Sequence, residues 1–137
     1  MPDVVPMIAY EDGVAALEWL AKAFGFRERA RMLGANGELA HGEMEAGDGL
    51  IMLGTPTPDY ESPKRHREHC ESARKWSQVP YIIDGVLVEV DDVDAHYARA
   101  RQAGALILSE LEDGGPGRRY RAEDLEGHRW MFLQRSP

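Results

Sequence analysis

Two stretches of the chain share a helical pattern of hydrophobic and polar positions. Residues 12–25 and 91–104 both carry apolar side chains three or four positions apart, which places those side chains on one side of a helix. They are Val14, Leu17, Ala21 and Phe24 in the first stretch and Val93, Tyr97, Ala100 and Ala103 in the second. Each stretch begins with an aspartate, which can accept hydrogen bonds from the first helical turn, and ends with a glycine, which suits a left-handed C-terminal residue. The pattern therefore predicts two similar helices.

Strand-like segments flank both predicted helices in the same order. An apolar run precedes each helix, at residues 4–10 and 86–90, and strand-like segments with a turn follow it. The helix-ending glycines, Gly25 and Gly104, are 79 positions apart, and the turn glycines, Gly49 and Gly127, are 78 positions apart. Because two landmarks keep nearly the same offset, the pattern indicates an internal repeat.

The repeat predicts an α+β fold made of two βαβββ modules in one domain that spans residues 1–137. We place the first module at about residues 4–57 and the second at about residues 80–135, with a polar linker or lid at 57–79. A single module would leave one face of its sheet bare. Two modules can curl their mixed sheets around a shared cleft, which is the natural place for a ligand.

Composition narrows the classes of partner. The chain has 137 residues, 43% of them hydrophobic, and a net charge of −8, so it can bury a core and would repel nucleic acid. No signal peptide is visible at the N-terminus, and the longest apolar runs are too short to span a membrane. The lone cysteine, Cys70, suits a reducing compartment. We therefore expect a cytoplasmic protein without membrane or nucleic-acid partners.

Several short motifs occur in an order that resembles the vicinal oxygen chelate superfamily. They are Lys22–Phe26, Ala40–Met44, Val88–Asp94, Ala103–Ala105 and Asp124–Trp130. This superfamily contains glyoxalases, bleomycin-resistance proteins and ring-cleaving dioxygenases. The resemblance covers nearly the whole chain except residues 57–79. It implies paired βαβββ modules, a U-shaped pocket and a homodimer.

The resemblance also implies where a metal enzyme of this family would hold its His, Gln or Glu ligands. These positions lie on the first and last strands of each module, and here they fall near Val5 or Pro6, near Gly85, at Met131 and within residues 50–53. None of these side chains suits a divalent cation. We therefore predict a protein that binds a small organic molecule without a metal cofactor, as bleomycin-resistance proteins do. The alternative is a lyase, isomerase or dioxygenase that binds a divalent metal through nonstandard ligands.

His41 and Glu43 are the candidate catalytic residues. They are two positions apart in a predicted strand, so their side chains point to the same face. In the cleft, the pair could perform acid–base chemistry, and His41 could also bind the ligand. Alternatively, His41 hydrogen-bonds within the sheet and Glu43 is solvated. A metal enzyme would use His41 with Glu43 or His128.

Three further residues are candidates for ligand binding. Arg119 follows a glycine-rich turn and could bind a carboxylate or phosphate, or it could balance the acidic surface. Trp130 should share a face with Phe132 and could stack on a flat apolar ligand, or it could belong to the core. Met52 lies in the strand-like segment at residues 50–53 and would contribute an apolar wall.

The segment at residues 57–79 has its own helical pattern. Ser62 and Pro63 suit the start of a helix, and His66, His69, Ala73 and Trp76 follow at helical spacing. A lid over the pocket is one interpretation, because long inserted segments are often functional. A metal held by His66, His69 and Cys70 is another, although a fourth ligand is not visible. A third class of function, a protein-interaction domain, would show an exposed apolar patch and no enclosed cavity.

Overall fold

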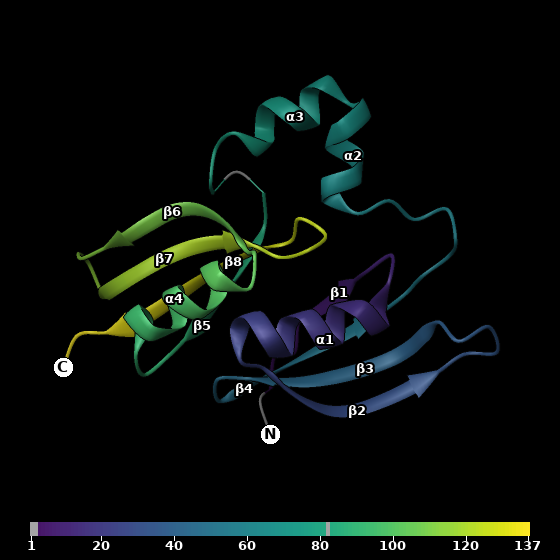
Figure 1. The fold of residues 1–137 in the computed structure, drawn as a ribbon, viewed down its shortest axis with the longest axis horizontal. Coiled ribbons are helices and arrows are strands. Elements are labelled where there is room, and N and C mark those ends of the chain that lie inside the picture. Colours follow the sequence, from purple (N-terminus) through teal and green to yellow (C-terminus); the bar gives the residue numbers. More distant parts are fainter. Residues whose placement is uncertain (1–2, 82) are drawn as a thin grey trace.

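The computed structural model describes residues 3–81 and 83–137, which form two similar halves joined by a helical insert (Figure 1). The first half contains β1 (Met7–Ala9), α1 (Gly13–Phe24), β2 (Arg27–Leu33), β3 (Leu39–Ala46) and β4 (Gly49–Gly54). The second contains β5 (Gly85–Glu89), α4 (Val93–Gln102), β6 (Leu106–Glu112), β7 (Gly117–Glu123) and β8 (Arg129–Arg135). The insert contains α2 (Pro63–His69) and α3 (Glu71–Ser77). The predicted order of strand, helix and three strands is confirmed in both halves.

Each half forms a four-stranded mixed sheet with the same strand order. The first sheet runs β1-β4-β3-β2 and the second β5-β8-β7-β6. In each sheet the edge strand β1 or β5 pairs in parallel, and the other neighbours are antiparallel. The matching topology confirms the α+β fold with two βαβββ units. No helix among the described residues is long and apolar enough to cross a membrane.

The ends of the two long helices follow the local sequence rules. The carboxylates of Asp12 and Asp92 accept hydrogen bonds from the amides of Ala15 and Ala95, each at 3.1 Å. Gly25 ends α1 with a φ of 72°, where a side chain would be strained. These caps explain why the helices begin and end close to the predicted residues.

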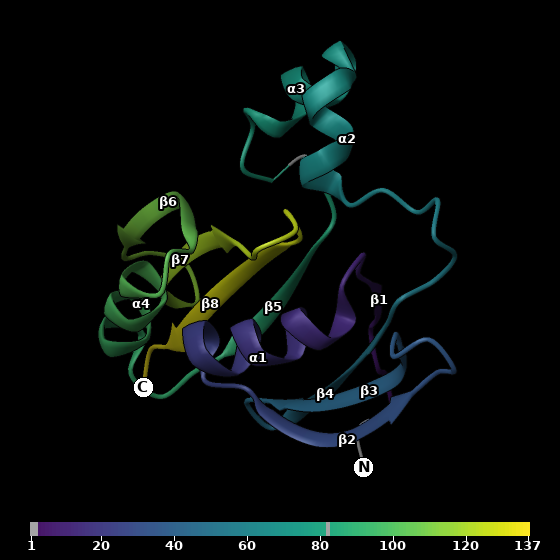
Figure 2. The ribbon, with the colours of Figure 1, turned by 45° about the vertical axis from the view of Figure 1, so that its right-hand side comes forward.

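Each sheet carries its helix on one side only, and we call the opposite side its open face (Figure 2). In the first sheet, Gly42 of β3 lies against Leu17 of α1 and Met44 is buried in the core. The residues that alternate with them, His41 and Glu43, therefore belong to the open face. In the second sheet, Tyr120 of β7 and Phe132 of β8 contact His96 of α4. The open face of that sheet therefore carries the residues that alternate with these two along β7 and β8, such as Arg121 and Met131.

The two halves share one hydrophobic core between their helical sides. The ring of Phe24, at the end of α1, lies 4.7 Å from that of Phe132, and the ring of Phe26 lies 5.3 Å from that of Trp130. His96 donates from Nε2 to the carbonyl oxygen of Phe24 at 2.9 Å. Because residues from both halves complete this cluster, neither sheet buries its helical side alone.

The second half also holds both ends of α1. The carboxylate of Glu126 accepts hydrogen bonds from the backbone amides of Glu11 and Asp12 at 2.6 and 2.9 Å. At the other end, the guanidinium of Arg99 donates to the carbonyl oxygens of Lys22 and Ala21 at 2.9 and 3.1 Å. Polar groups that a helix leaves unsatisfied at its termini are thus satisfied across the module boundary.

Candidate functional site

The open face of the first sheet carries the predicted histidine–glutamate pair. Nε2 of His41 lies 2.8 Å from Oε2 of Glu43, and the two side chains are 39% and 22% exposed. Nε of Arg29 lies 3.9 Å from the other carboxylate oxygen of Glu43. The prediction that His41 and Glu43 share a face is confirmed. With its orientation set by a carboxylate, the half-buried imidazole can exchange a proton or form a hydrogen bond with a bound molecule.

An apolar pocket adjoins this pair. It has a volume of about 340 Å³ and is lined by His41, Met52, Met7, Ala40 and Pro56, among others. Met52 lies between Glu43 on β3 and Met7 on β1 in the register of the sheet. The structure therefore brings two predicted ligand-binding residues, His41 and Met52, to one pocket.

Arg119 lies on β7 of the second sheet and contacts other residues of the β6–β7 hairpin. Its Nη2 atom lies 3.4 Å from Oε1 of Glu112, and its Nη1 atom donates to the carbonyl oxygen of Gly114 at 2.9 Å. These contacts favour the alternative in which Arg119 balances an acidic side chain at the surface. The ligand-binding role of Arg119 remains a prediction.

Trp130 lies in the core, which was the other interpretation of its sequence pattern. Its side chain faces the helical side of the second sheet, shares that side with Phe132 as predicted, and is only 1% exposed. Its indole nitrogen donates to Oδ2 of Asp124 at 3.1 Å. This burial favours the core interpretation, and the ligand-binding role of Trp130 remains a prediction.

The four predicted ligand-binding residues do not meet in one cleft within a single chain. The pocket between the halves, of about 530 Å³, is lined by the turn at residues 46–49 and by parts of β5 and β8, and includes none of them. The pockets on the two open faces share no lining residue. The two sheets are thus arranged with their helical sides together, and their open faces lie apart.

A buried polar cluster occupies the turn between β7 and β8. Asp124 accepts hydrogen bonds from the hydroxyl of Tyr10 at 2.5 Å and from the amides of Glu126 and His128, both at 3.0 Å. Burial raises the pKa of Asp124 and, together with the nearby carboxylate, raises that of Tyr10. His128 donates from Nε2 to the carbonyl oxygen of Ala9 at 2.7 Å, so it serves this cluster and does not join His41 and Glu43.

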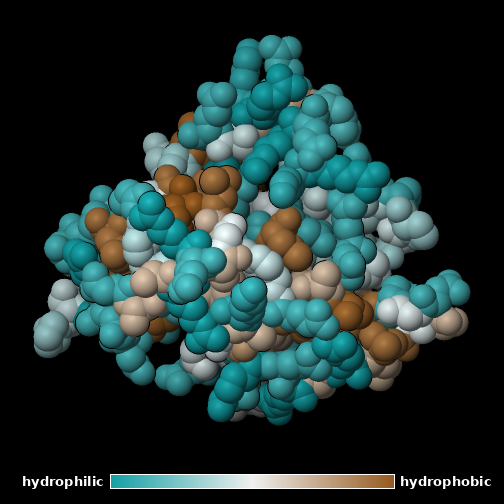
Figure 3. Space-filling model, viewed as in Figure 1, coloured by the Kyte–Doolittle hydropathy of each residue, from teal (hydrophilic) through white to brown (hydrophobic). Residues whose placement is uncertain are grey.

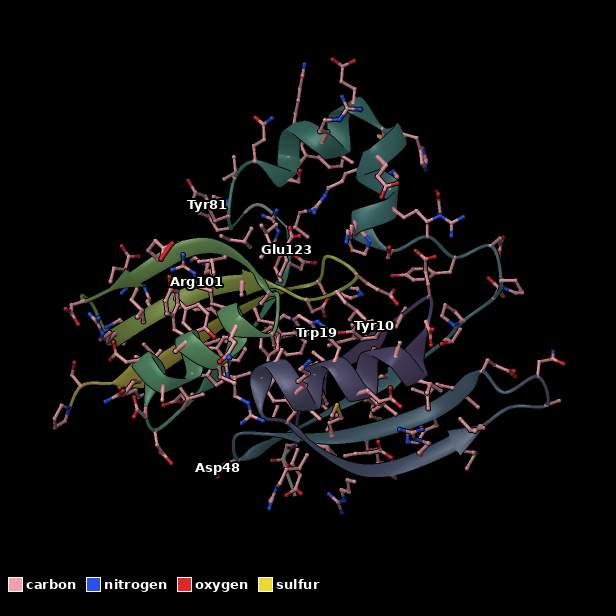
Figure 4. The ribbon with its side chains drawn as sticks, viewed as in Figure 1. Tyr10, Trp19, Asp48, Tyr81, Arg101 and Glu123 are labelled. Carbon is pink, nitrogen blue, oxygen red and sulfur yellow. The ribbon has the colours of Figure 1, made fainter. Side chains whose placement is uncertain are left out.

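The helical insert is tied to the second sheet by a buried ion network that the sequence did not reveal. Glu123, only 2% exposed, accepts hydrogen bonds from both Nη atoms of Arg67 at 2.7 and 2.9 Å and from Nε of Arg129 at 3.0 Å. Arg129 also donates to the carbonyl oxygens of Ser77 and Val79. Figure 4 shows Glu123 where the insert meets the sheet. The insert therefore covers one end of the second open face, and its role as a lid remains a prediction.

The donor groups do not fit a metal ion of the kind that enzymes of this fold use. Gly85, Met131 and residues 50–53 stand at the positions where the resemblance implies ligands. In the insert, the imidazole of His69 lies 2.8 Å from Glu61 and 5.8 Å, between ring centroids, from His66. Across residues 3–81 and 83–137, no three His, Cys, Asp or Glu side chains are grouped as a metal site would require.

Comparison with known proteins identifies the family. The model of the glyoxalase/bleomycin resistance protein/dioxygenase superfamily matches residues 4–132. An uncharacterized protein of Mycobacterium bovis is 31% identical over 97% of this chain and 83% of its own length. The crystal structure of TioX from Micromonospora sp. ML1 is 32% identical, covers 99% of this chain and 98% of its own, and superposes with a TM-score of 0.71.

Two more distant structures share the fold. TnmS3, an antibiotic binding protein from Streptomyces sp. CB03234, is 20% identical with a TM-score of 0.68. The bleomycin-binding protein of Streptomyces verticillus, solved in complex with copper(II)-bleomycin, is 16% identical with a TM-score of 0.62. Each covers 99% of this chain and 98% of its own. The internal repeat, the paired sheets and these matches agree that the chain belongs to the glyoxalase/bleomycin resistance protein/dioxygenase superfamily.

Proposed function

We propose that this protein binds a small organic molecule on the open faces of its sheets, without a metal ion. The observation that carries the proposal is the apolar pocket on the first sheet, with the half-buried His41–Glu43 pair at its side. An apolar surface with a few polar groups is the usual composition of a small-molecule site. The names of structurally similar proteins, an antibiotic binding protein and a bleomycin-binding protein, support the same class of ligand.

A second copy of the chain completes this site in our proposal. In one chain the edge strands β1 and β5 expose Met7 and Leu87, whose exposed fractions are 81% and 50%. Large apolar side chains left bare at sheet edges are typical of association surfaces. A homodimer that joins the first open face of one copy to the second open face of the other would produce the predicted shared cleft.

The cellular setting is also part of the proposal. Figure 3 shows the side of the molecule seen in Figure 1 as mainly hydrophilic, with small hydrophobic patches. The net charge of −8 disfavours nucleic acid as a partner, and the single thiol of Cys70 suits the cytoplasm. A free small molecule is therefore the partner that we propose.

Binding of a neutral aromatic probe, N-phenyl-1-naphthylamine, tests the proposal. We expect saturable fluorescence enhancement with the wild-type protein. Met52→Lys, which places a charge in the pocket, should weaken binding about tenfold or more. Val4→Lys is the matched control, because Val4 is 82% exposed and does not line the pocket. Absence of probe binding, or equal binding by all three proteins, would contradict a ligand site on this face.

An enzyme of the same fold is the alternative, favoured by the 2.8 Å contact between His41 and Glu43. In the metal-dependent form of this alternative, the pair would supply nonstandard ligands for lyase, isomerase or dioxygenase chemistry. The metal content of tag-free protein, measured after incubation with zinc, nickel, manganese or iron(II) and dialysis, decides between the two. We expect much less than one metal ion per chain. One ion per chain that is lost in His41→Ala would make the enzyme the primary interpretation.

A further inference from the structure

Arg121 is the arginine on the second open face that has no carboxylate partner among the described residues. Strands β7 and β8 carry four arginines on this face. Arg119 is paired with Glu112, Arg135 with Glu89, and Arg129 with Glu123 and two backbone carbonyl groups. Arg121, half-buried in the middle of β7 opposite Met131, forms no hydrogen bond or ion pair with any residue that the structure describes. An arginine in a pocket without a carboxylate keeps all five N–H donors available for a bound group.

The charges around Arg121 leave this part of the sheet positive in an acidic protein. The nearest carboxylate along the same face of β7 is Glu123, which already accepts hydrogen bonds from both Arg67 and Arg129. One carboxylate therefore serves two guanidinium groups, and Arg121 adds a third positive charge. In a chain with a net charge of −8, such a local excess favours an anion at this place.

Apolar and aromatic side chains surround the guanidinium group. A pocket of about 230 Å³ is lined by Arg121 together with Tyr81, Ile83, Leu87 and Met131. The guanidinium carbon of Arg121 lies 5.7 Å from the centre of the Tyr81 ring. Tyr81 is 72% exposed, on the segment that leads from α3 to β5 above the second sheet (Figure 4). The pocket thus places apolar and aromatic side chains next to a guanidinium group that has no carboxylate partner among the described residues.

We propose that Arg121 binds the anionic group of the ligand, a carboxylate or sulfonate on a flat apolar molecule whose rings lie against Tyr81, Leu87 and Met131. This assignment rests on the proposed small-molecule function and specifies the chemical class of its ligand. The guanidinium fork would bind two oxygens of the acid, and the apolar walls would exclude water from that contact. The binding affinity of a neutral molecule with the same rings should not depend on Arg121.

A matched pair of probes separates the two interactions. The anionic probe is 8-anilinonaphthalene-1-sulfonate, and the neutral one, N-phenyl-1-naphthylamine, has the same rings without the sulfonate. We expect Arg121→Gln to raise the dissociation constant of the sulfonate about tenfold, the loss typical of a charge-assisted contact, and to change that of the neutral probe less than about twofold. Arg121→Lys should give an intermediate value. Arg118→Gln, on the same strand but paired with Asp94 and Asp113 on its other side, should match the wild type.

The possible outcomes are distinct. If neither probe binds the wild-type protein, the proposed function fails, and this assignment fails with it. If both probes bind and Arg121→Gln weakens them equally or not at all, only the anion assignment is overturned. A further explanation is that Arg121 holds two copies of the chain together. Sedimentation of each variant, with circular dichroism as a check on folding, tests this explanation. Dissociation of the copies in Arg121→Gln and Arg121→Lys would assign the arginine to a contact between chains and would also overturn the proposal.

Discussion

Glu123→Ala is expected to lower the free energy of unfolding by about 3–5 kcal/mol, the usual effect of removing one partner from a buried ion pair. The carboxylate of Glu123 is the common acceptor for Arg67 from the insert and Arg129 from β8, and its side chain is 2% exposed. Without it, Arg129, of which only 3% of the side chain is exposed, would keep its charge without an anionic partner. Urea unfolding at neutral pH measures the loss.

Glu112→Ala is the matched control for this change. Glu112 also pairs with an arginine of β7, but its side chain is 54% exposed, so its loss should cost less than about 1 kcal/mol. The insert provides a second readout. We expect limited proteolysis within residues 57–79 to accelerate in Glu123→Ala and not in Glu112→Ala. Equal stability of the two variants would show that the buried network does not hold the insert.

Trp130→Ala should lower the free energy of unfolding by about 3–5 kcal/mol, as large-to-small changes at fully buried aromatic residues do. The indole lies against Phe24 and Phe26 of the first half, and its nitrogen satisfies Asp124. The substitution would leave a cavity at the junction of the halves and remove one hydrogen bond from a buried carboxylate. Urea unfolding followed by circular dichroism measures the effect.

Trp76→Ala is the control, because Trp76 is 52% exposed in α3 and its truncation should change stability by less than about 1 kcal/mol. The comparison also tests the role of Trp130. If Trp130→Ala kept the wild-type stability but no longer bound N-phenyl-1-naphthylamine, the indole would be a ligand-binding group after all. If Trp130→Ala lost stability but its folded fraction still bound N-phenyl-1-naphthylamine as the wild type does, the indole would belong to the core.

The sequence predicted the features that local rules determine. Asp12 and Asp92 cap helices because a short acidic side chain reaches the amides three residues ahead. Gly25 ends α1 because its left-handed backbone angle strongly favours a residue without a side chain. The alternation along β3 placed His41 and Glu43 together. Each of these outcomes depends on neighbours within four positions in the chain.

The unpredicted features depend on distant parts of the chain. Arg119 and Arg121 share one face of β7, yet Arg119 meets Glu112 and Arg121 does not meet a carboxylate, because the pairing of β6 with β7 is irregular there. Alternation along β8 placed Trp130 and Phe132 on the same face. It did not show which face is buried, because the opposite face carries the apolar residues Met131 and Leu133. The network around Glu123 joins residues up to 56 positions apart.

The shared core also has a consequence for how the protein is made. Phe24 and Phe26 are synthesised about 100 residues before Trp130 and Phe132, the rings that cover them. Glu126, which accepts hydrogen bonds from the start of α1, is separated from that helix by a similar length of chain. During synthesis, the aromatic side chains of the first module therefore stay uncovered until the second module has been made. Apolar surface that is exposed for such an interval favours aggregation, so the nascent first module is the stage of folding at which this protein is most vulnerable.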